Sequence, residues 1–84
     1  AEQEKQTSDV EEPGFYMVQT GIYRVRTNAE REMERLKAQG FPAFMTFKDG
    51  FYYVRAGAFR NMENAVRQEQ ELRKLGYPTL LVKT

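Results

Sequence analysis

Two short segments, residues 15–19 and 51–55, carry side chains suited to ligand binding at every second position. Alternate residues of an extended chain lie on the same side, so each set shares one face of a strand. The positions hold Phe15, Met17 and Gln19 in the first segment, and Phe51, Tyr53 and Arg55 in the second. Aromatic rings, a thioether, an amide and a guanidinium supply apolar area, hydrogen bonds and charge. An exposed patch of this kind indicates a binding surface.

The residues that most enzymes use for catalysis are missing. The chain has no cysteine and no histidine, and its one serine is Ser8, near the start of the chain. A thiolate metal site, a disulfide and the usual general base are therefore excluded. The glutamates fall mainly on predicted helix faces, with no nucleophile–base pair. We expect a non-catalytic protein with no cofactor and no metal site.

The two segments belong to an internal repeat. Residues 15–44 superpose on residues 51–80 at a constant offset of 36, and 11 of the 30 aligned positions are identical. A solenoid needs at least three repeats to bury a core. Two repeats instead predict two halves of one pseudo-symmetric domain.

Each repeat reads as strand, helix, strand. Aromatic and β-branched residues predict the strands, and Gly21 and Gly57 are expected to end the first strand of each repeat. Asp49-Gly50 is a strong hairpin signal between the repeats. The four predicted strands are residues 15–20, 43–47, 51–56 and 79–83.

The predicted helices have recognisable ends. Thr27 and Glu30 have the spacing of a capping box, although a start one turn earlier is also compatible with the pattern, and Asn61 suits an N-cap. Gly40 and Gly76 suit the left-handed residue that closes a helix. Just after these glycines, Phe41 is expected to contact Leu36 and Tyr77 to contact Leu72, and Pro42 and Pro78 prevent the helices from continuing. Each helix also has an apolar stripe that should face the core. The stripes are Ala29, Met33 and Leu36 in the first helix, and Ala65, Leu72 and Leu75 in the second.

The resulting fold class is α+β, with the ferredoxin-like order βαββαβ. Right-handed crossovers place both helices on one face of a four-stranded antiparallel sheet of order 4-1-3-2, leaving the other face open. Val18 and Val54 are the best core candidates, which directs the six binding-type side chains to the open face. The alternative, in which Tyr16 and Tyr52 face outward, stays open at this point.

Charge and composition suggest one domain and a linker. Residues 1–14 hold five acids and one lysine, a net charge of −4, and are predicted to be a disordered acidic linker. Residues 15–84 form the predicted domain, with repeats 15–48 and 51–84, twelve basic and seven acidic residues, and a net charge of +5. We expect a monomer that does not insert into membranes, because the sequence has no long apolar run.

The doubled pattern resembles the SPOR domain, the sporulation-related repeat of bacterial envelope proteins. The family pattern is an aromatic residue, Val, Gln, Gly and a second aromatic residue, followed by Asn-Ala and Leu-x-x-x-Gly. The first repeat has Tyr16-Met17-Val18-Gln19-Thr20-Gly21-Ile22-Tyr23, then Asn28-Ala29 and Leu36 to Gly40. The second has Tyr52-Tyr53-Val54-Arg55-Ala56-Gly57-Ala58-Phe59, then Asn64-Ala65 and Leu72 to Gly76. The resemblance covers residues 15–83.

The resemblance implies an RNP-like fold and a peptidoglycan-binding module. Such domains bind denuded glycan strands, from which amidases have removed the stem peptides. They direct attached proteins, including cell-wall amidases and cell-division proteins, to the wall or septum of the bacterial envelope, whether periplasmic or extracellular. Ligand contacts in the family lie on the open sheet face. The resemblance implies Gln19, Phe51 and Tyr53 as contacts, and together with the strand alternation it gives a predicted glycan-binding set of Met17, Gln19, Ile22, Phe51, Tyr53 and Arg55.

Two positions depart from the family pattern. Ile22 occupies a position that is often serine, and Arg55 stands where the first repeat has Gln19. Removal of a stem peptide uncovers a carboxylate on muramic acid, and a guanidinium is a fork-shaped partner for a carboxylate. Our hypothesis is that Arg55 recognises that carboxylate.

Two other functions are compatible with the pattern. Residues 49–56 partly match a signature of RNA recognition motifs, but Asp49, Tyr52 and Ala56 depart from it, so single-stranded RNA binding is disfavoured. The exposed aromatic face could also dock a protein partner. Short glycan fragments would perturb the sheet face only if the ligand is glycan.

Overall fold

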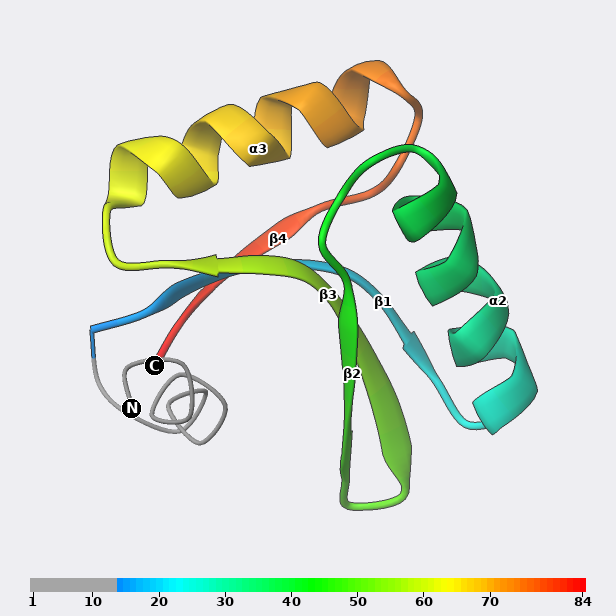
Figure 1. Cartoon of the computed structure of the whole chain (residues 1–84). Coiled ribbons are helices and arrows are strands. Elements are labelled where there is room, and N and C mark those ends of the chain that lie inside the picture. The colour runs from blue at the N-terminus through cyan, green and yellow to red at the C-terminus, as the bar shows by residue number, and fades with distance from the viewer. Residues whose placement is uncertain (1–13) are drawn as a thin grey trace, which may run out of the picture.

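The computed structural model describes residues 14–84 as two strand–helix–strand repeats (Figure 1). The predicted linker, apart from Gly14, lies outside the described residues. The elements are β1 (Tyr16–Tyr23), α2 (Arg26–Ala38), β2 (Phe44–Lys48), β3 (Phe51–Phe59), α3 (Met62–Lys74) and β4 (Leu80–Lys83).

The four strands form one antiparallel sheet of order β2-β3-β1-β4, which confirms the predicted order. The repeat-initial strands β1 and β3 are central. Both helices lie on the same side of the sheet (Figure 1), so the opposite side has no helix over it. We call this second side the open face. No helix within residues 14–84 is long and apolar enough to cross a membrane.

Both helices end as their sequences predict. Gly40 and Gly76 have positive φ angles of 91° and 95°. The amide of Phe41 donates to the carbonyl of Leu36 at 3.0 Å, and that of Gly40 donates to Lys37 at 3.0 Å. This pair of bonds defines a Schellman ending, and the second repeat makes the same pair from Tyr77 to Leu72 and from Gly76 to Arg73.

The helix starts differ from each other. Asn61 caps α3 by accepting a bond of 2.8 Å from the amide of Glu63, as predicted. The predicted capping box at Thr27 is wrong, because α2 already begins at Arg26 and Val25 occupies the cap position without a side-chain bond. Arg26 instead pairs with Glu30 at 2.8 Å across the first turn.

The Asp49-Gly50 hairpin is confirmed, with both residues at positive φ, at 54° and 84°. This conformation fits the twist of the flanking strands. The first strands, however, are longer than predicted. Gly21 and Gly57 lie inside β1 and β3 rather than ending them.

The two glycines lie where the pairing of β1 and β3 changes register. Between Met17 and Gln19 the strand β3 contains an extra residue, and between Gln19 and Gly21 the strand β1 contains one. A Cβ on Gly21 would come within 2.8 Å of the Tyr23 ring, and one on Gly57 within 2.9 Å of the Phe59 ring. In each repeat, therefore, the glycine makes room for the aromatic ring two residues later.

The core lies between the helices and the sheet. It contains Val18, Ala29, Leu36, Val54, Ala56, Ala65, Leu72 and Tyr77. Tyr16 and Tyr52 pack against this cluster, which decides the question left open by the sequence. Leu75 was expected in the apolar stripe of α3, but it is 51% exposed because the helix ends at Lys74.

Candidate functional site

The six predicted site residues lie on the open face. Strand pairing places Met17 beside Val82, Gln19 beside Arg55, and Ile22 beside Tyr53. Phe51 precedes the core-packed Tyr52 and pairs with Lys48 of β2. Strict alternation from Val18 would turn Ile22 toward the helices, but the extra residue Thr20 shifts it to the open face.

Two of these residues are less accessible than we expected. Met17 has no exposed surface and Gln19 is 6% exposed, and Phe15 beside them is also buried. Met17 and Gln19 lie on the central strand β1, flanked by β3 on one side and β4 on the other, and Phe15 directly precedes this strand. They form the buried layer of the open face, and the half-buried side chains of Tyr53, Arg55 and Phe51 are more accessible to a ligand.

Arg55 joins the centre of the face into one cluster. Its Nε donates a hydrogen bond of 3.2 Å to Gln19 Oε1, and its Nη1 lies 3.9 Å from Met17 Sδ. Its Cζ also lies 5.4 Å from the centroid of the Tyr53 ring. Since these contacts fix the plane of the guanidinium, the group is positioned before any ligand arrives.

A groove of about 400 Å³ lies over this cluster. All four strands and the hairpin contribute residues at or beside them to its lining. Its lining is Met17, Thr46, Lys48, Asp49, Tyr53, Arg55, Val82 and Thr84. The mixture of aromatic, aliphatic, hydroxyl and charged groups suits a ligand with both apolar and polar surfaces.

Two further arginines stack on aromatic rings in a crosswise manner that we did not predict. Arg24 Cζ lies 5.2 Å from the Phe51 ring centroid, and Arg60 Cζ lies 4.7 Å from that of Phe15. Arg24 and Arg60 occupy equivalent repeat positions, as do the two phenylalanines, so each repeat stacks its arginine on the other repeat's ring. The identity of Arg24 and Arg60 in the repeat was the signal that could have revealed them.

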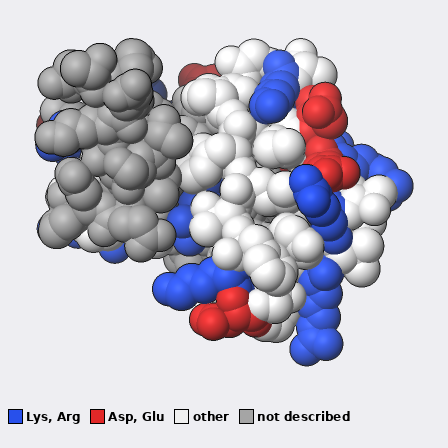
Figure 2. All heavy atoms as spheres, turned by 60° about the horizontal axis from the view of Figure 1, so that its bottom comes forward, with Lys and Arg blue, Asp and Glu red and all other residues white. Residues whose placement is uncertain are grey.

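Basic residues predominate on one side of the molecule. Figure 2 shows lysine and arginine side chains spread over a largely uncharged surface, with the acidic residues in a few small groups. Residues 15–84 carry a net charge of +5. The resulting field favours an anionic ligand.

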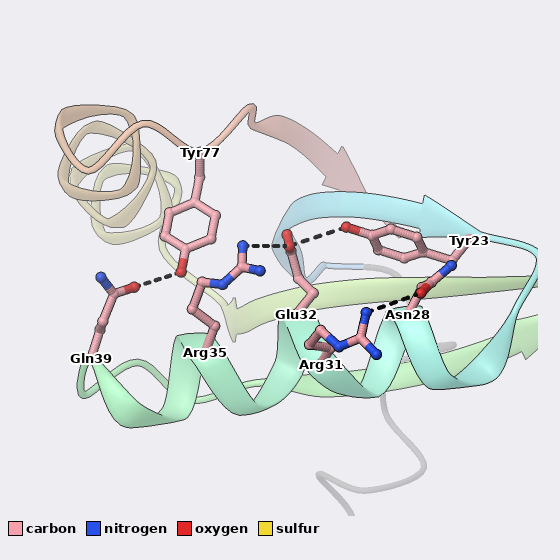
Figure 3. A network of polar contacts seen from close by, with 7 residues as sticks. All are labelled: Tyr23, Asn28, Arg31, Glu32, Arg35, Gln39 and Tyr77. Carbon is pink, nitrogen blue, oxygen red and sulfur yellow. Dashed lines mark hydrogen bonds and ion pairs between the residues drawn. The ribbon is translucent and has the colours of Figure 1, made fainter.

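The helix side holds a polar network with a different character. Glu32 is 6% exposed, accepts a bond of 3.1 Å from the Tyr23 hydroxyl, and lies 3.6 Å from Arg35 (Figure 3). Burial, and then the bond to Glu32, raise the pKa of Tyr23. In the second repeat, the buried Glu69 is bonded to Thr79 and Arg73. Glu32 therefore ties α2 to β1 through Tyr23, and Glu69 ties α3 to the segment just before β4 through Thr79.

Other kinds of site have little support in the described part of the chain. Within residues 14–84 no three Asp, Glu, His or Cys side chains gather to hold a metal ion. One buried side-chain oxygen there, Thr20 Oγ1, lacks a hydrogen-bond partner, and it lies at the extra residue of β1. The open face is therefore the candidate site.

Comparisons with known proteins identify the family of the chain. The family model described as the SPOR domain matches residues 12–83. A solved structure with 31% sequence identity and a TM-score of 0.79 is described as the solution structure of the peptidoglycan-binding domain of the Bacillus subtilis cell wall lytic enzyme CwlC. The alignment covers 84% of this chain and 90% of that one. No curated protein sequence matches the chain significantly. The chain belongs to the SPOR domain family.

Proposed function

We propose that this chain is a non-catalytic module that binds peptidoglycan through its open face and selects glycan strands denuded of stem peptides. The observation that carries the proposal is the Arg55 cluster, in which a guanidinium and an aromatic ring line one groove and a buried amide holds the guanidinium in place. The family, and the peptidoglycan-binding domain of CwlC at 31% identity, support the ligand class.

The chemistry of a glycan strand matches that of the face. Pyranose rings present C–H surfaces that pack on aromatic rings, so Tyr53 and Phe51 supply the apolar contacts. The sugar hydroxyls need hydrogen-bond partners on the groove walls, such as Thr46. Met17 and Gln19 support these groups from below, and Ile22 extends the apolar surface along β1.

Selection for denuded strands follows from charge. A stem peptide is joined to muramic acid through an amide, and its removal leaves a carboxylate on the sugar. Arg55 is the fork-shaped cation that would bind this carboxylate in the groove. A strand that keeps its peptides has no such anion at that position and carries a bulky chain instead.

The wider context of the module is also a proposal. We place the domain boundary between residues 14 and 15, ahead of a monomeric domain that includes both repeats. Its binding directs an attached protein, such as a cell-wall amidase or a cell-division protein, to the wall or septum. This role places the module in the bacterial envelope, on the periplasmic or extracellular side.

An amide-resolved NMR titration tests the proposal. The 84-residue chain is titrated with purified glycan strands, one sample denuded and one with stem peptides intact. Shifts concentrated at Gln19, Ile22, Phe51, Tyr53 and Arg55 with the denuded sample alone are expected. Shifts of equal size with both samples would contradict the selectivity, and no shifts with either would contradict glycan binding.

A further inference from the structure

Arg24 is distinguished from the helix arginines by its partner. Arg26, Arg35 and Arg73 pair with glutamates at 2.8–3.6 Å, which offsets their charge within the domain. Among the described residues Arg24 makes no ion pair, and its contact is the Phe51 ring. An exposed arginine held on an aromatic platform keeps its charge available to an anion.

The Arg24–Phe51 pair lies at a defined distance from the Arg55 cluster. Phe51 and Arg55 are four residues apart on β3 and face the same way, so their Cα atoms are separated by about 13 Å at the usual rise per residue. Arg24 is held on the Phe51 ring, whereas Arg55 is held by Gln19 and the Tyr53 ring, so each guanidinium has its own anchor and its own aromatic ring.

A ligand that uses both positions must therefore present two anions on one extended chain. A denuded glycan strand does so, because each disaccharide carries one uncovered carboxylate. Phe51 would support a sugar ring beside Arg24 in the same way that Tyr53 does beside Arg55. The face then offers the same combination, a ring and a guanidinium, twice along β3.

We propose that Arg24 and Phe51 form a second carboxylate subsite, so that the open face binds two consecutive disaccharide units of a denuded strand, with the strand running along β3. The inference rests on the proposed function and goes further by assigning Arg24 and a minimum ligand length. Arg24 then makes the domain prefer longer glycan strands, and it does not contribute to the binding of a single disaccharide at Arg55.

Two purified ligands test the proposal: a denuded disaccharide with one muramic carboxylate, and the denuded tetrasaccharide with two. Isothermal titration calorimetry measures the affinity of each for wild type, Arg24→Ala and Arg24→Lys. For Arg24→Ala we expect a loss of about tenfold to thirtyfold for the tetrasaccharide, in the lower half of the range for a charged hydrogen bond, and less than about twofold for the disaccharide. Arg24→Lys should fall between wild type and Arg24→Ala, because it keeps the charge and loses the fork.

Arg67→Ala is the matched control. Arg67 is an exposed arginine of α3 bonded to Asn64, so its removal changes the net charge equally at a distance from the open face. If Arg24→Ala and Arg67→Ala have equal effects, or if Arg24→Ala weakens both ligands alike, the second subsite is refuted while glycan binding stands. If wild type binds neither ligand, the proposed function fails and the subsite with it.

Discussion

Arg55→Ala should weaken the binding of denuded glycan strands by about tenfold to thirtyfold. The guanidinium is held by Gln19 at 3.2 Å, contacts Met17 at 3.9 Å, and lies over Tyr53. A hydrogen bond to a charged group contributes about 1.5–3 kcal/mol. Because the groove is open to solvent, we take the lower half of that range, which corresponds to about one to one and a half orders of magnitude in Kd. The substitution also releases Gln19, so its amide loses its fixed orientation.

The assay is calorimetric titration with denuded strands at several salt concentrations, using variants at Arg55 and a control at Arg67. Arg55→Ala should reduce both the affinity and its dependence on salt, since a cation that binds an anion directly is screened by added salt. Arg55→Lys should keep the salt dependence but bind more weakly than wild type, because lysine lacks the planar fork. Arg67→Ala should change the affinity by less than about twofold.

Equal losses for Arg55→Ala and Arg67→Ala would refute the reasoning, because they would show that the net charge of the domain matters and the geometry of the cluster does not. Unchanged affinity and salt dependence in Arg55→Ala would remove Arg55 from the site. Thermal unfolding of each variant checks that a loss of binding does not reflect a loss of folded protein.

Three further predictions concern stability and are measured by urea unfolding. Gly57→Ala should lower the free energy of unfolding by about 2–4 kcal/mol, because Gly57 has a φ of 98° and the new Cβ would meet the Phe59 ring. Gly40→Ala should lower it by only about 1–2 kcal/mol, because nothing lies within 4 Å of the new Cβ there. Equal losses in the two variants would show that the contact with the Phe59 ring does not contribute. Tyr23→Phe should lower the free energy of unfolding by about 1 kcal/mol at neutral pH, because the hydroxyl of Tyr23 donates to Glu32. Since the pKa of Tyr23 is raised in the folded state, this stabilisation is present below the ordinary value of 10.0 and is lost as the pH rises through the folded-state pKa. A stability difference from wild type that persists at high pH would contradict this role of the hydroxyl. Thr20→Val should raise the free energy of unfolding by about 1 kcal/mol, because Thr20 Oγ1 is buried without a hydrogen-bond partner among the described residues. A lower stability of the variant would show that the hydroxyl does have a hydrogen-bond partner.

The parts of the fold that the sequence predicted well are those with local causes. Gly40 and Gly76 end the helices with the predicted bonds, because a left-handed residue followed by proline leaves few alternatives. Asp49-Gly50 likewise determines the hairpin. With these ends fixed, the repeat and the handedness of its crossovers leave one reasonable strand order.

The parts that the sequence did not predict depend on contacts between repeats. The register changes of β1 against β3 involve one extra residue in each strand, and no local pattern marks them. They place Gly21 inside β1 and turn Ile22 outward. The burial of Met17 and the stack of Arg24 on Phe51 also require the other repeat to be in place. Alternation therefore predicted that Met17 and Gln19 lie on the open side of the sheet, but it did not show that they are buried there.

The differences between the repeats explain how a pseudo-symmetric fold can recognise a ligand with a direction. Gln19 and Arg55 are equivalent positions and pair with each other, so the pseudo-twofold axis passes between them at the centre of the open face. Two identical halves would present the same groups in both directions along the sheet. Here the axis separates an amide from a guanidinium, and Met17 is matched by Tyr53. A glycan strand has chemically distinct ends, so if the open face binds glycan along β3 as we propose, this asymmetry gives one orientation of the strand better contacts than the reverse.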